Sequence, residues 1–269
     1  MNDRTETTPV ALTVAGFDPS GGAGVVADVK TFTAFGCFAA AAVTSLTYQN
    51  TTGVFGAAHQ TAEAVRAQVL AVVEDFCVAG AKTGMLPTRE IIVEVARLFR
   101  ETSLPAPVVD PVVRSTSGFD LIDDEALDAL KRELLPLARV VTPNVPEAER
   151  ITGLSIRGFV GMLEAARVMR DMGARAVLVK GGHLEGDAVD VLLDEEGRVR
   201  AFTAGRIETT STHGTGCTLA AAIAACLARG LNLEDSVAAA KRFVLEAIRR
   251  APGLGRGHGP VNHAVAARL

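Results

Sequence analysis

Short apolar runs alternate with amphipathic segments along most of the chain. The apolar runs predict buried β-strands over residues 10–15, 39–46, 78–83, 108–110, 140–142 and 176–180. The amphipathic segments predict helices over residues 24–35, 62–75, 89–100, 124–134 and 160–172. In the first of these helices, Val25, Val29 and Phe32 recur at helical spacing and share one face. Such alternation is typical of βαβ units, in which helices cover both faces of a parallel sheet.

The alternation breaks once, after the last predicted parallel strand. Residues 189–193 and 199–203 are short apolar runs joined by an acidic, glycine-containing turn, which predicts an antiparallel hairpin at one edge of the sheet. Two further helices are predicted over residues 218–229 and 233–250. We therefore expect a three-layer α/β/α fold with a mostly parallel central sheet and an antiparallel edge hairpin.

Length and segment composition favour one domain. The chain has 269 residues and contains neither a Pro/Ser-rich linker nor an internal repeat, so we expect a single domain over residues 1–269. Residues 1–9 lack an apolar core, so they are expected to be a disordered lead-in rather than a secretory signal or transit peptide. A glycine-rich tail, residues 253–259, follows the last predicted helix.

Charge and cysteine content exclude several classes of protein. Lys and Arg number 27 against 31 Asp and Glu, a net charge of -4, so no basic field attracts nucleic acid or an anionic membrane. The longest run of small apolar residues, 219–228, is about half the roughly 20 residues that a bilayer span needs. The cysteines form no Cys-x-x-Cys pair, which argues against a disulfide framework or a cysteine zinc site. We expect a reducing, cytoplasmic location.

Three glycine-rich loops follow predicted strands, at residues 16–24, 180–183 and 213–218. In open α/β sheets, ligands bind at the carboxyl ends of strands, where such loops lie. The first loop contains Gly22-x-Gly24, but no acidic residue follows about twenty positions later, as a dinucleotide-binding fingerprint requires. It also lacks the Lys and Ser/Thr of a P-loop. A tight strand-to-helix turn is the alternative interpretation.

The third glycine-rich loop runs directly into a small apolar helix, and Cys217 follows Gly214, Thr215 and Gly216 there. Glycines let successive backbone N–H groups point to one place, and a helix N-terminus adds about half a positive charge. The segment predicts an anion hole, although a plain Gly/Thr helix cap has the same sequence. The helix end is also expected to lower the pKa of the Cys217 thiol. Cys37, Cys77 and Cys226 are expected to pack in the core.

Three acidic residues stand out by their positions. Asp28 lies beside the apolar face of the first helix, so it either flanks the core or points into a ligand site. Asp110 ends its strand at the ligand-facing edge and, with Glu147, could attract Mg²⁺ carried by phosphates. Glu147 also stands three residues after Asn144, the spacing of a capping box, so a purely structural role is the alternative.

Seven segments together identify a family. They are residues 15–24, 27–32, 49–51, 82–86, 142–148, 179–183 and 212–218. In sequence, order and spacing they resemble the hydroxymethylpyrimidine/phosphomethylpyrimidine kinases of thiamine biosynthesis, which belong to the ribokinase-like superfamily. The likeness extends over nearly the whole chain.

The resemblance implies ATP-dependent phosphorylation of the hydroxymethyl group of 4-amino-5-hydroxymethyl-2-methylpyrimidine. A second transfer onto the monophosphate would then give the diphosphate, with ATP and Mg²⁺ as cofactors. In the family, the turn at residues 214–217 cradles the transferring phosphate. Cys217 stands where most ribokinase-like enzymes place an aspartate base, and as a thiolate it would accept the hydroxyl proton. Relatives are often homodimers, so a homodimer is expected.

The resemblance also implies two groups of ligand-binding residues. The pyrimidine would be surrounded by Gly16, Ala23, Asp28, Gln49, Met85 and Val112. In that group, Asp28 and Gln49 would form hydrogen bonds with its polar edge. The nucleotide phosphates and Mg²⁺ would be bound by Asn144, Glu147 and Lys180, with Asp110 assisting at the metal. Lys241 could approach ATP, although a solvated helix lysine is the alternative.

Two alternatives to this function remain open at the level of sequence. Phe17 and Tyr48 depart from the family pattern and could trim the pocket, which would affect substrate preference more than the reaction class. A pyridoxal kinase is one alternative, because some relatives with the same cysteine turn phosphorylate pyridoxal. A non-catalytic pyrimidine-binding regulatory module is the other, and the presence of Cys217, Lys180 and Glu147 argues against it.

Overall fold

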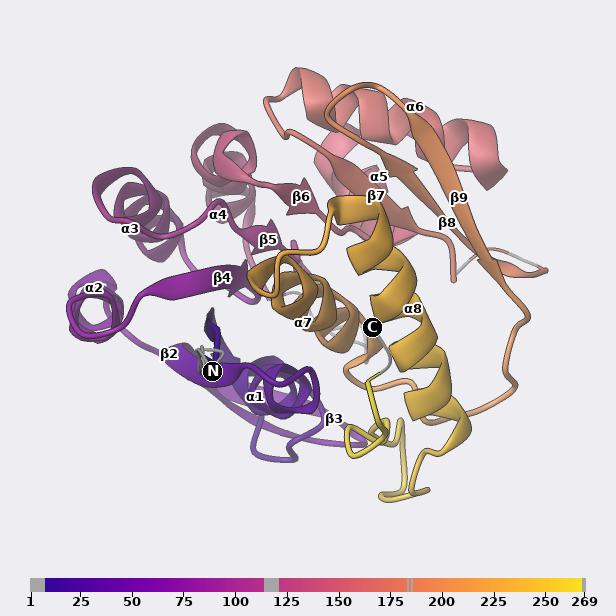
Figure 1. The fold of residues 1–269 in the computed structure, drawn as a ribbon, viewed down its shortest axis with the longest axis horizontal. Helices are drawn as coiled ribbons and strands as arrows, with labels where there is room; N and C mark the ends of the chain where they lie inside the picture. The colour runs from indigo at the N-terminus through magenta and orange to yellow at the C-terminus, as the bar shows by residue number, and fades with distance from the viewer. Residues whose placement is uncertain (1–7, 114–120, 183, 185, 268–269) are drawn as a thin grey trace, which may run out of the picture.

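A central sheet organises the fold. The computed structural model describes residues 8–113, 121–182, 184 and 186–267, and within them nine strands form one sheet with helices on both faces (Figure 1). The strands are β1 (Val10–Phe17), β2 (Phe38–Asn50), β3 (Gly53–His59), β4 (Val78–Thr83), β5 (Val108–Val109), β6 (Val140–Val141), β7 (Val177–Lys180), β8 (Ala188–Leu193) and β9 (Val199–Ala204). Their order is β3-β2-β1-β4-β5-β6-β7-β8-β9. The pairs from β2 to β7 are parallel, which confirms the predicted mostly parallel sheet.

Two helical layers cover this sheet. One layer contains α1 (Gly24–Ala34), α7 (Thr215–Ala228) and α8 (Leu233–Arg249). The other contains α2 (Ala62–Val73), α3 (Arg89–Glu101), α4 (Asp124–Ala129), α5 (Val145–Thr152) and α6 (Gly158–Asp171) (Figure 1). A π-helical turn, Leu130–Leu134, continues α4. Helix α7 packs on β1, β4 and β5 and is flanked by α1 and α8, which explains why its sequence is apolar on nearly every side.

Both edges of the sheet are antiparallel. The predicted hairpin forms at one edge as β8 and β9. At the opposite edge, β2 continues to Asn50 and pairs with β3 in a second hairpin, which the sequence analysis missed. The predicted strand ended at residue 46, and three of the next four residues, Thr47, Gln49 and Asn50, are polar. A strand at the edge of an antiparallel pair needs only one apolar face, so such a sequence can still form it.

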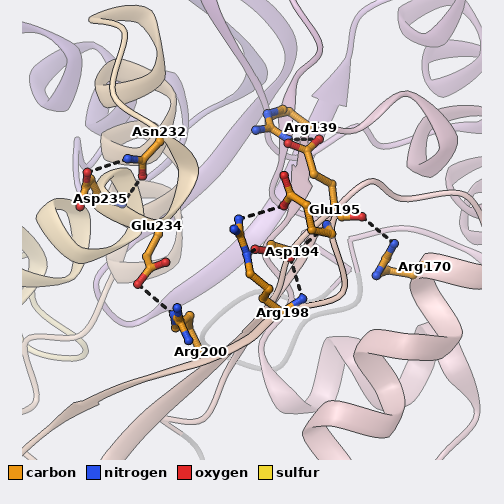
Figure 2. Close-up of polar contacts among 10 residues, drawn as sticks. Arg139, Arg170, Asp194, Glu195, Arg198, Arg200, Asn232, Glu234 and Asp235 are labelled. Carbon is orange, nitrogen blue, oxygen red and sulfur yellow. Dashed lines mark hydrogen bonds and ion pairs between the residues drawn. The ribbon is translucent and has the colours of Figure 1, made fainter.

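Polar contacts fix the turn between β8 and β9. Asp194 accepts hydrogen bonds from the backbone N–H groups of Glu196 at 3.1 Å and Arg198 at 2.8 Å. Its other oxygen accepts from Arg198 Nε at 2.7 Å, and Glu195 pairs with Arg139 at 2.6 Å (Figure 2). The partners of these ion pairs are partly exposed, so each pair contributes at most about 1 kcal/mol. Their main effect is to orient the turn.

The start of α7 differs from the prediction. The helix begins at Thr215, and its N-cap is Gly214 with φ +80°, a left-handed conformation that favours glycine. The sequence had predicted the first helical residue three positions later. Cys217 therefore lies inside the first helical turn and not in the loop before it.

Two smaller expectations need correction. Cys37 and Cys226 are buried as predicted, but Cys77 is exposed, so core packing was the wrong prediction for it. Of the predicted disordered lead-in, residues 1–7 lie outside the described part of the chain. Pro9 belongs to the fold, because its carbonyl accepts a hydrogen bond from Phe38 N at 2.9 Å. Among the described helices, we find none with the length and apolar character needed to cross a bilayer.

Candidate active site

Several loops meet where the central parallel strands end. Because β1, β5, β6 and β7 run in the same direction, their carboxyl ends lead into residues 18–23, Asp110, Asn144 and Lys180 along one edge of the sheet. The N-terminus of α7 reaches this edge. A Cβ atom added to Gly216 would stand 3.1 Å from Lys180 Nζ and 3.8 Å from the Asp110 carboxylate. The fold thus brings the predicted anion loop next to the predicted lysine and carboxylates.

Lys180 joins the two carboxylates that were predicted to bind a metal. Its Nζ lies 3.1 Å from Asp110 Oδ1 and 4.0 Å from Glu147 Oε2. Burial by itself lowers the pKa of Lys180, but the two carboxylates outweigh burial and raise the pKa, so the ammonium keeps its proton. Burial raises the pKa of Glu147 to about 7, although Lys180 opposes that rise. Glu147 can therefore change its charge near neutral pH.

Asn144 and Glu147 also cap α5. Asn144 Oδ1 accepts a hydrogen bond from Glu147 N at 2.9 Å, and Glu147 Oε2 accepts one from Asn144 N at 2.8 Å. This is the reciprocal capping box that their spacing predicted. The structural role is therefore confirmed for both residues, and any role toward a nucleotide would come in addition to it.

The carboxylates at this edge can bind a metal ion only if phosphate oxygens supply further ligands. Among the residues that the structure describes, no three or more His, Cys, Asp or Glu side chains form a group that could hold a metal. Mg²⁺ commonly uses one or two carboxylates together with water and phosphate oxygens. Asp110 and Glu147 provide those two carboxylates on either side of Lys180. The donor set fits Mg²⁺ that arrives with a nucleotide.

A second ion pair, which is fully buried, lies between α1 and β4. Asp28 Oδ2 accepts hydrogen bonds from Lys82 Nζ at 2.8 Å and from Thr13 Oγ1 at 2.7 Å. Burial raises the pKa of Asp28. Within the described residues, Asp28 Oδ1 has no hydrogen-bond partner. Asp28 is therefore not a surface charge at the border of the core. Its Oδ2 forms an ion pair with Lys82, and its Oδ1 is free to accept a hydrogen bond from a further donor.

Lys82 is a site residue that the sequence analysis did not single out. Burial by itself lowers the pKa of its ammonium, but the carboxylates of Asp28 and, more weakly, Asp110 raise it more, so Lys82 stays charged. The sequence did contain a signal. Lys82 is a lone cation in an otherwise small and apolar strand, and a buried cation requires a buried anion. Asp28 was the anion that lacked a partner.

The thiol of Cys217 is protonated at neutral pH. Burial raises its pKa to about 12. The ammonium of Lys82 and the backbone N–H of Gly24 favour the thiolate, whereas the carboxylates of the site disfavour it. The prediction that the helix end lowers this pKa is therefore wrong. The loss of water around the sulfur outweighs the partial charge of the helix N-terminus.

The first and third glycine loops touch each other through Asp18 and His213. His213 Nε2 donates to Asp18 Oδ2 at 2.7 Å, and Asp18 also accepts from the backbone N–H groups of Ser20 at 2.8 Å and Ala23 at 2.9 Å. A Cβ atom on Gly22 would lie 2.4 Å from the His213 ring. The sequence analysis gave neither Asp18 nor His213 a role. The available signal was the Asp-Pro-Ser-Gly turn, in which an Asp side chain accepts from the backbone two residues later.

The residues expected around the pyrimidine come together in part. A Cβ atom on Gly16 would stand 3.2 Å from the Met85 sulfur, so these two positions are in contact. Gln49 Nε2 donates to Thr47 Oγ1 at 2.7 Å, and Thr47 Oγ1 donates to the carbonyl of Phe17 at 2.8 Å. The end of β1 and the end of β2 therefore form one surface beside the first glycine loop.

Val112 and Tyr48 lie in two other parts of the structure. The N–H of Val112 donates to the carbonyl of Asp110 at 2.8 Å, and Val112 lines a small hollow together with Thr83. Tyr48 is 57% exposed, and its ring lies 3.0 Å from where a Cβ atom of Gly56 would be. Tyr48 therefore belongs to the exposed face of the β2–β3 hairpin and not to the lining of the pocket.

Lys241 is neither solvated nor available to a nucleotide. Its Nζ donates to Asp190 Oδ2 at 2.7 Å and to the carbonyls of Ala188 at 2.9 Å and Phe202 at 2.6 Å. These three bonds use all the donors of an ammonium group. Asp190 in turn accepts from Gly181 N at 3.1 Å. Both expectations for Lys241 are wrong, because the side chain links α8 to β8 and β9 inside the fold.

Comparison with curated proteins points to one family. A family model described as phosphomethylpyrimidine kinase matches residues 18–262. The thiamine biosynthesis bifunctional protein ThiED of Geobacter sulfurreducens is 50% identical over 257 residues, covering 95% of this chain and 52% of that protein. The chain thus spans about half the length of this relative. The hydroxymethylpyrimidine/phosphomethylpyrimidine kinase of Rhizobium meliloti is 49% identical over 260 residues, covering 95% of this chain and 97% of that protein.

Solved structures have the same fold. Bacillus subtilis pyridoxal kinase, in an ADP complex, matches with a TM-score of 0.88 at 36% identity, covering 96% of this chain and 98% of that chain. Phosphomethylpyrimidine kinase from Clostridium difficile 630 matches with a TM-score of 0.80 at 38% identity, covering 90% of this chain and 100% of that chain. The expected ribokinase-like fold is confirmed. Because kinases named for two different substrates, pyridoxal and phosphomethylpyrimidine, share it, the fold by itself does not define the substrate.

Proposed function

The chain belongs to the phosphomethylpyrimidine kinase family, and we propose that it phosphorylates 4-amino-5-hydroxymethyl-2-methylpyrimidine with ATP and then phosphorylates the monophosphate, for thiamine biosynthesis. The observation that carries this proposal is the meeting of the α7 N-terminus with Lys180 and Asp110. A phosphate there would be attracted by backbone N–H groups, by the helix dipole and by a lysine. Phosphoryl transfer depends mainly on such positioning and charge stabilisation.

The nucleotide phosphates are proposed to lie beside Lys180, near the start of α5. Asn144 and Glu147 are held rigidly there by their capping box, so they can face the phosphates without a loss of side-chain freedom. Asp110 and Glu147 would hold Mg²⁺, which, when bound, neutralises charge on the β- and γ-phosphates. Before the metal binds, both carboxylates raise the pKa of Lys180, so its ammonium is charged when the nucleotide arrives.

Cys217 is proposed to accept the proton of the substrate hydroxyl. With a pKa of about 12, only about one thiol in 10⁵ is a thiolate at pH 7. Lys82 is the cation that would stabilise this thiolate. The transition state of phosphoryl transfer is loose, so the backbone N–H groups of residues 214–216 are expected to contribute more than the base does.

The pyrimidine is proposed to bind on the surface formed by the ends of β1 and β2. Gly16, Ala23, Met85 and Val112 would contact the ring, and Gln49 would form hydrogen bonds with its polar edge. Asp28 is fully buried, and its Oδ1, which has no partner within the described residues, would accept a hydrogen bond from a donor such as the 4-amino group. An unsatisfied buried carboxylate oxygen is costly, so a ligand donor at that point would be favoured.

We also propose that two copies associate through the β2–β3 hairpin. Leu46, Tyr48 and Phe55 expose 43%, 57% and 69% of their surface on this edge hairpin. Large apolar side chains gathered at a sheet edge are typical of an interaction surface. Sedimentation of the wild type against Tyr48→Lys and Phe55→Lys tests this, and a wild-type monomer would contradict it.

A reducing, cytoplasmic location is part of the proposal. All four cysteines are free in the structure, including the buried pair Cys37 and Cys226. Proteins of oxidising compartments more often pair their cysteines, whereas free thiols are typical of a reducing one. Fractionation of cells that express the chain at its natural level would test the location.

A mass-resolved assay with ATP and hydroxymethylpyrimidine tests the proposed reaction. We expect the monophosphate to appear first and the diphosphate to follow. The main competing function is a pyridoxal kinase, which the likeness to the Bacillus subtilis pyridoxal kinase structure favours. If pyridoxal is turned over far faster than hydroxymethylpyrimidine, the protein is a pyridoxal kinase and the proposed reaction is wrong. Tight pyrimidine binding without any ATP turnover would instead indicate a non-catalytic regulatory module.

A further inference from the structure

The glycine-rich tail after α8 is held against the turn between β2 and β3. The backbone N–H groups of Arg256 and Gly257 donate to Thr51 Oγ1 at 3.2 and 3.4 Å. The N–H of His258 donates to the carbonyl of Thr51 at 2.8 Å. Three consecutive N–H groups therefore converge on one residue of the hairpin.

The glycines of the tail are required by this close approach. A Cβ atom on Gly255 would lie 2.3 Å from Thr51 Oγ1, and one on Gly257 would lie 2.1 Å from the carbonyl oxygen of Thr51. Gly257 has no positive φ, so close packing alone explains why a glycine stands there. The spacing Gly255-x-Gly257 in the sequence is thus the signature of a contact and not of a loose end.

The same segment continues to the loop before α7. His213 N donates to the carbonyl of Gly259 at 3.0 Å, and Gly259 N donates to the carbonyl of Thr210 at 3.2 Å. Farther on, His263 Nε2 contacts Thr218 Oγ1 at 3.0 Å, one residue past the proposed base. The segment is therefore attached at one end to the hairpin and at the other end to the start of α7.

We propose that residues 255–263, which we call the C-terminal strap, set the position of the β2–β3 hairpin relative to the α7 N-terminus, with Thr51 as the positioning residue. This inference rests on the proposed function. Gln49 precedes Thr51 by two residues, so the strap fixes the strand end that would bind the pyrimidine. The pairing of β2 with β1 ends at Leu46, so the hairpin beyond that residue lies outside the parallel pairing, and the hydrogen bonds that hold it include those of Thr47 to Phe17 and of the strap to Thr51. A displacement of about 1 Å at a reacting group can cost about 10²-fold in rate.

Substitutions at both sides of the contact test the strap. Thr51→Val keeps the shape and removes the hydroxyl, whereas Thr51→Ser keeps the hydroxyl. Gly257→Ala places a methyl group against the Thr51 carbonyl. Gly205→Ala is the matched control, because Gly205 has an ordinary φ and open space around it. We expect KM for hydroxymethylpyrimidine to rise about tenfold in Thr51→Val and Gly257→Ala, with KM for ATP unchanged within about twofold.

Thr51→Ser and Gly205→Ala should behave as the wild type does. Hydrogen exchange of residues 44–58 gives a readout that needs no activity: exchange there should be faster in Thr51→Val and Gly257→Ala than in Gly205→Ala. If both KM values rise together with a fall in Tm, the contact is merely structural and the proposal is overturned. Unchanged exchange and unchanged KM in both variants would overturn it as well. A wild type that cannot phosphorylate the pyrimidine refutes the proposed function, and exchange alone then decides whether the strap holds the hairpin.

Discussion

The proposed nucleotide side and the proposed pyrimidine side of the site are held in place in different ways. On the proposed nucleotide side, Asp110 and Asn144 follow central parallel strands and Lys180 ends another, so each is fixed by the sheet. On the pyrimidine side, the β2–β3 hairpin lies at the sheet edge, and its turn is held by residues 205 positions away, as between Thr51 and Arg256. The proposed pyrimidine side therefore depends on a contact that is made outside the parallel sheet.

The largest effect is expected where the two sides meet, at Cys217. Cys217→Ala should lower kcat by about 10²–10⁴-fold, the usual contribution of a positioned base, while pyrimidine binding stays nearly intact. Turnover and equilibrium binding of the pyrimidine would be measured in parallel. Because the pKa of the thiol is about 12, wild-type kcat should also rise with pH between 6 and 9, and the variant should lose that rise. Near-normal turnover in Cys217→Ala would remove the residue from the base role.

The second largest effect is expected on protein stability, when the buried ion pair between Asp28 and Lys82 is broken. Asp28→Ala leaves Lys82 fully buried without its carboxylate, and breaking a buried ion pair in this way costs about 3–5 kcal/mol. Urea unfolding measures the loss. Asp28→Asn keeps a hydrogen-bond acceptor for Lys82 and is the better variant for testing whether Asp28 binds the substrate more than ATP. Unfolding of Asp28→Ala within about 1 kcal/mol of the wild type would show that Lys82 has found another partner.

The strap should make stability depend on pH through His263. Burial lowers the pKa of His263 from 6.5 to about 4. Between these values the unfolded chain binds a proton that the folded chain does not, so stability falls as pH falls from 6.5 to 4. At about 1.4 kcal/mol per pH unit, the loss amounts to about 3 kcal/mol.

His263→Gln provides the comparison for this pH effect. Thr218 donates its hydroxyl proton to the carbonyl of Gly214 at 2.8 Å, so His263 Nε2 must be the donor in its contact with Thr218. A glutamine amide can supply that donor without titrating. Unfolding free energies of both proteins at pH 7 and pH 4 should therefore differ in their pH dependence by about 3 kcal/mol. Equal pH dependence in the two proteins would contradict the burial of a neutral His263.

The smallest loss of stability is expected on the nucleotide side. Glu147→Gln can still complete the capping box and no longer buries a carboxylate whose pKa is raised by burial, so its unfolding free energy at pH 7 should not fall below that of the wild type. The variant loses the carboxylate proposed for Mg²⁺, and the Mg²⁺ concentration for half-maximal rate should rise about tenfold. Asn144→Ala is the matched variant, because it loses the cap and about 1 kcal/mol but keeps the charge of Glu147. An unchanged Mg²⁺ requirement in Glu147→Gln would remove Glu147 from the metal site.

Sequence reasoning worked best where a role depends on neighbours in the chain. The alternating pattern predicted the parallel strands and most helices, and the Asn144–Glu147 spacing predicted a capping box that the structure contains. It failed where a role depends on burial. The pKa of Cys217 was predicted to fall because its helix position was visible in the sequence, whereas the loss of solvent around the sulfur was not.

The pairing of distant residues was equally hidden. Asp28 and Lys82 are 54 positions apart; the sequence left Asp28 with two interpretations and gave Lys82 no role. Asp18 and His213 are 195 positions apart and lie in two loops whose contact follows from the strand order. Such pairs form because the sheet brings separate strand ends to one edge. A local sequence pattern does not show which distant residues will meet there.

By itself, the sequence determined most of the elements, the mostly parallel sheet, the glycine loops and the family, since these depend on periodicity, spacing and local motifs. Tertiary structure alone decided which charges are paired, which thiol is protonated and what the glycine-rich tail contacts. The physical reason is that periodicity is a property of neighbours along the chain. Desolvation and close packing depend instead on which segments meet in space, and here that includes a tail that meets a hairpin turn about 200 residues before it.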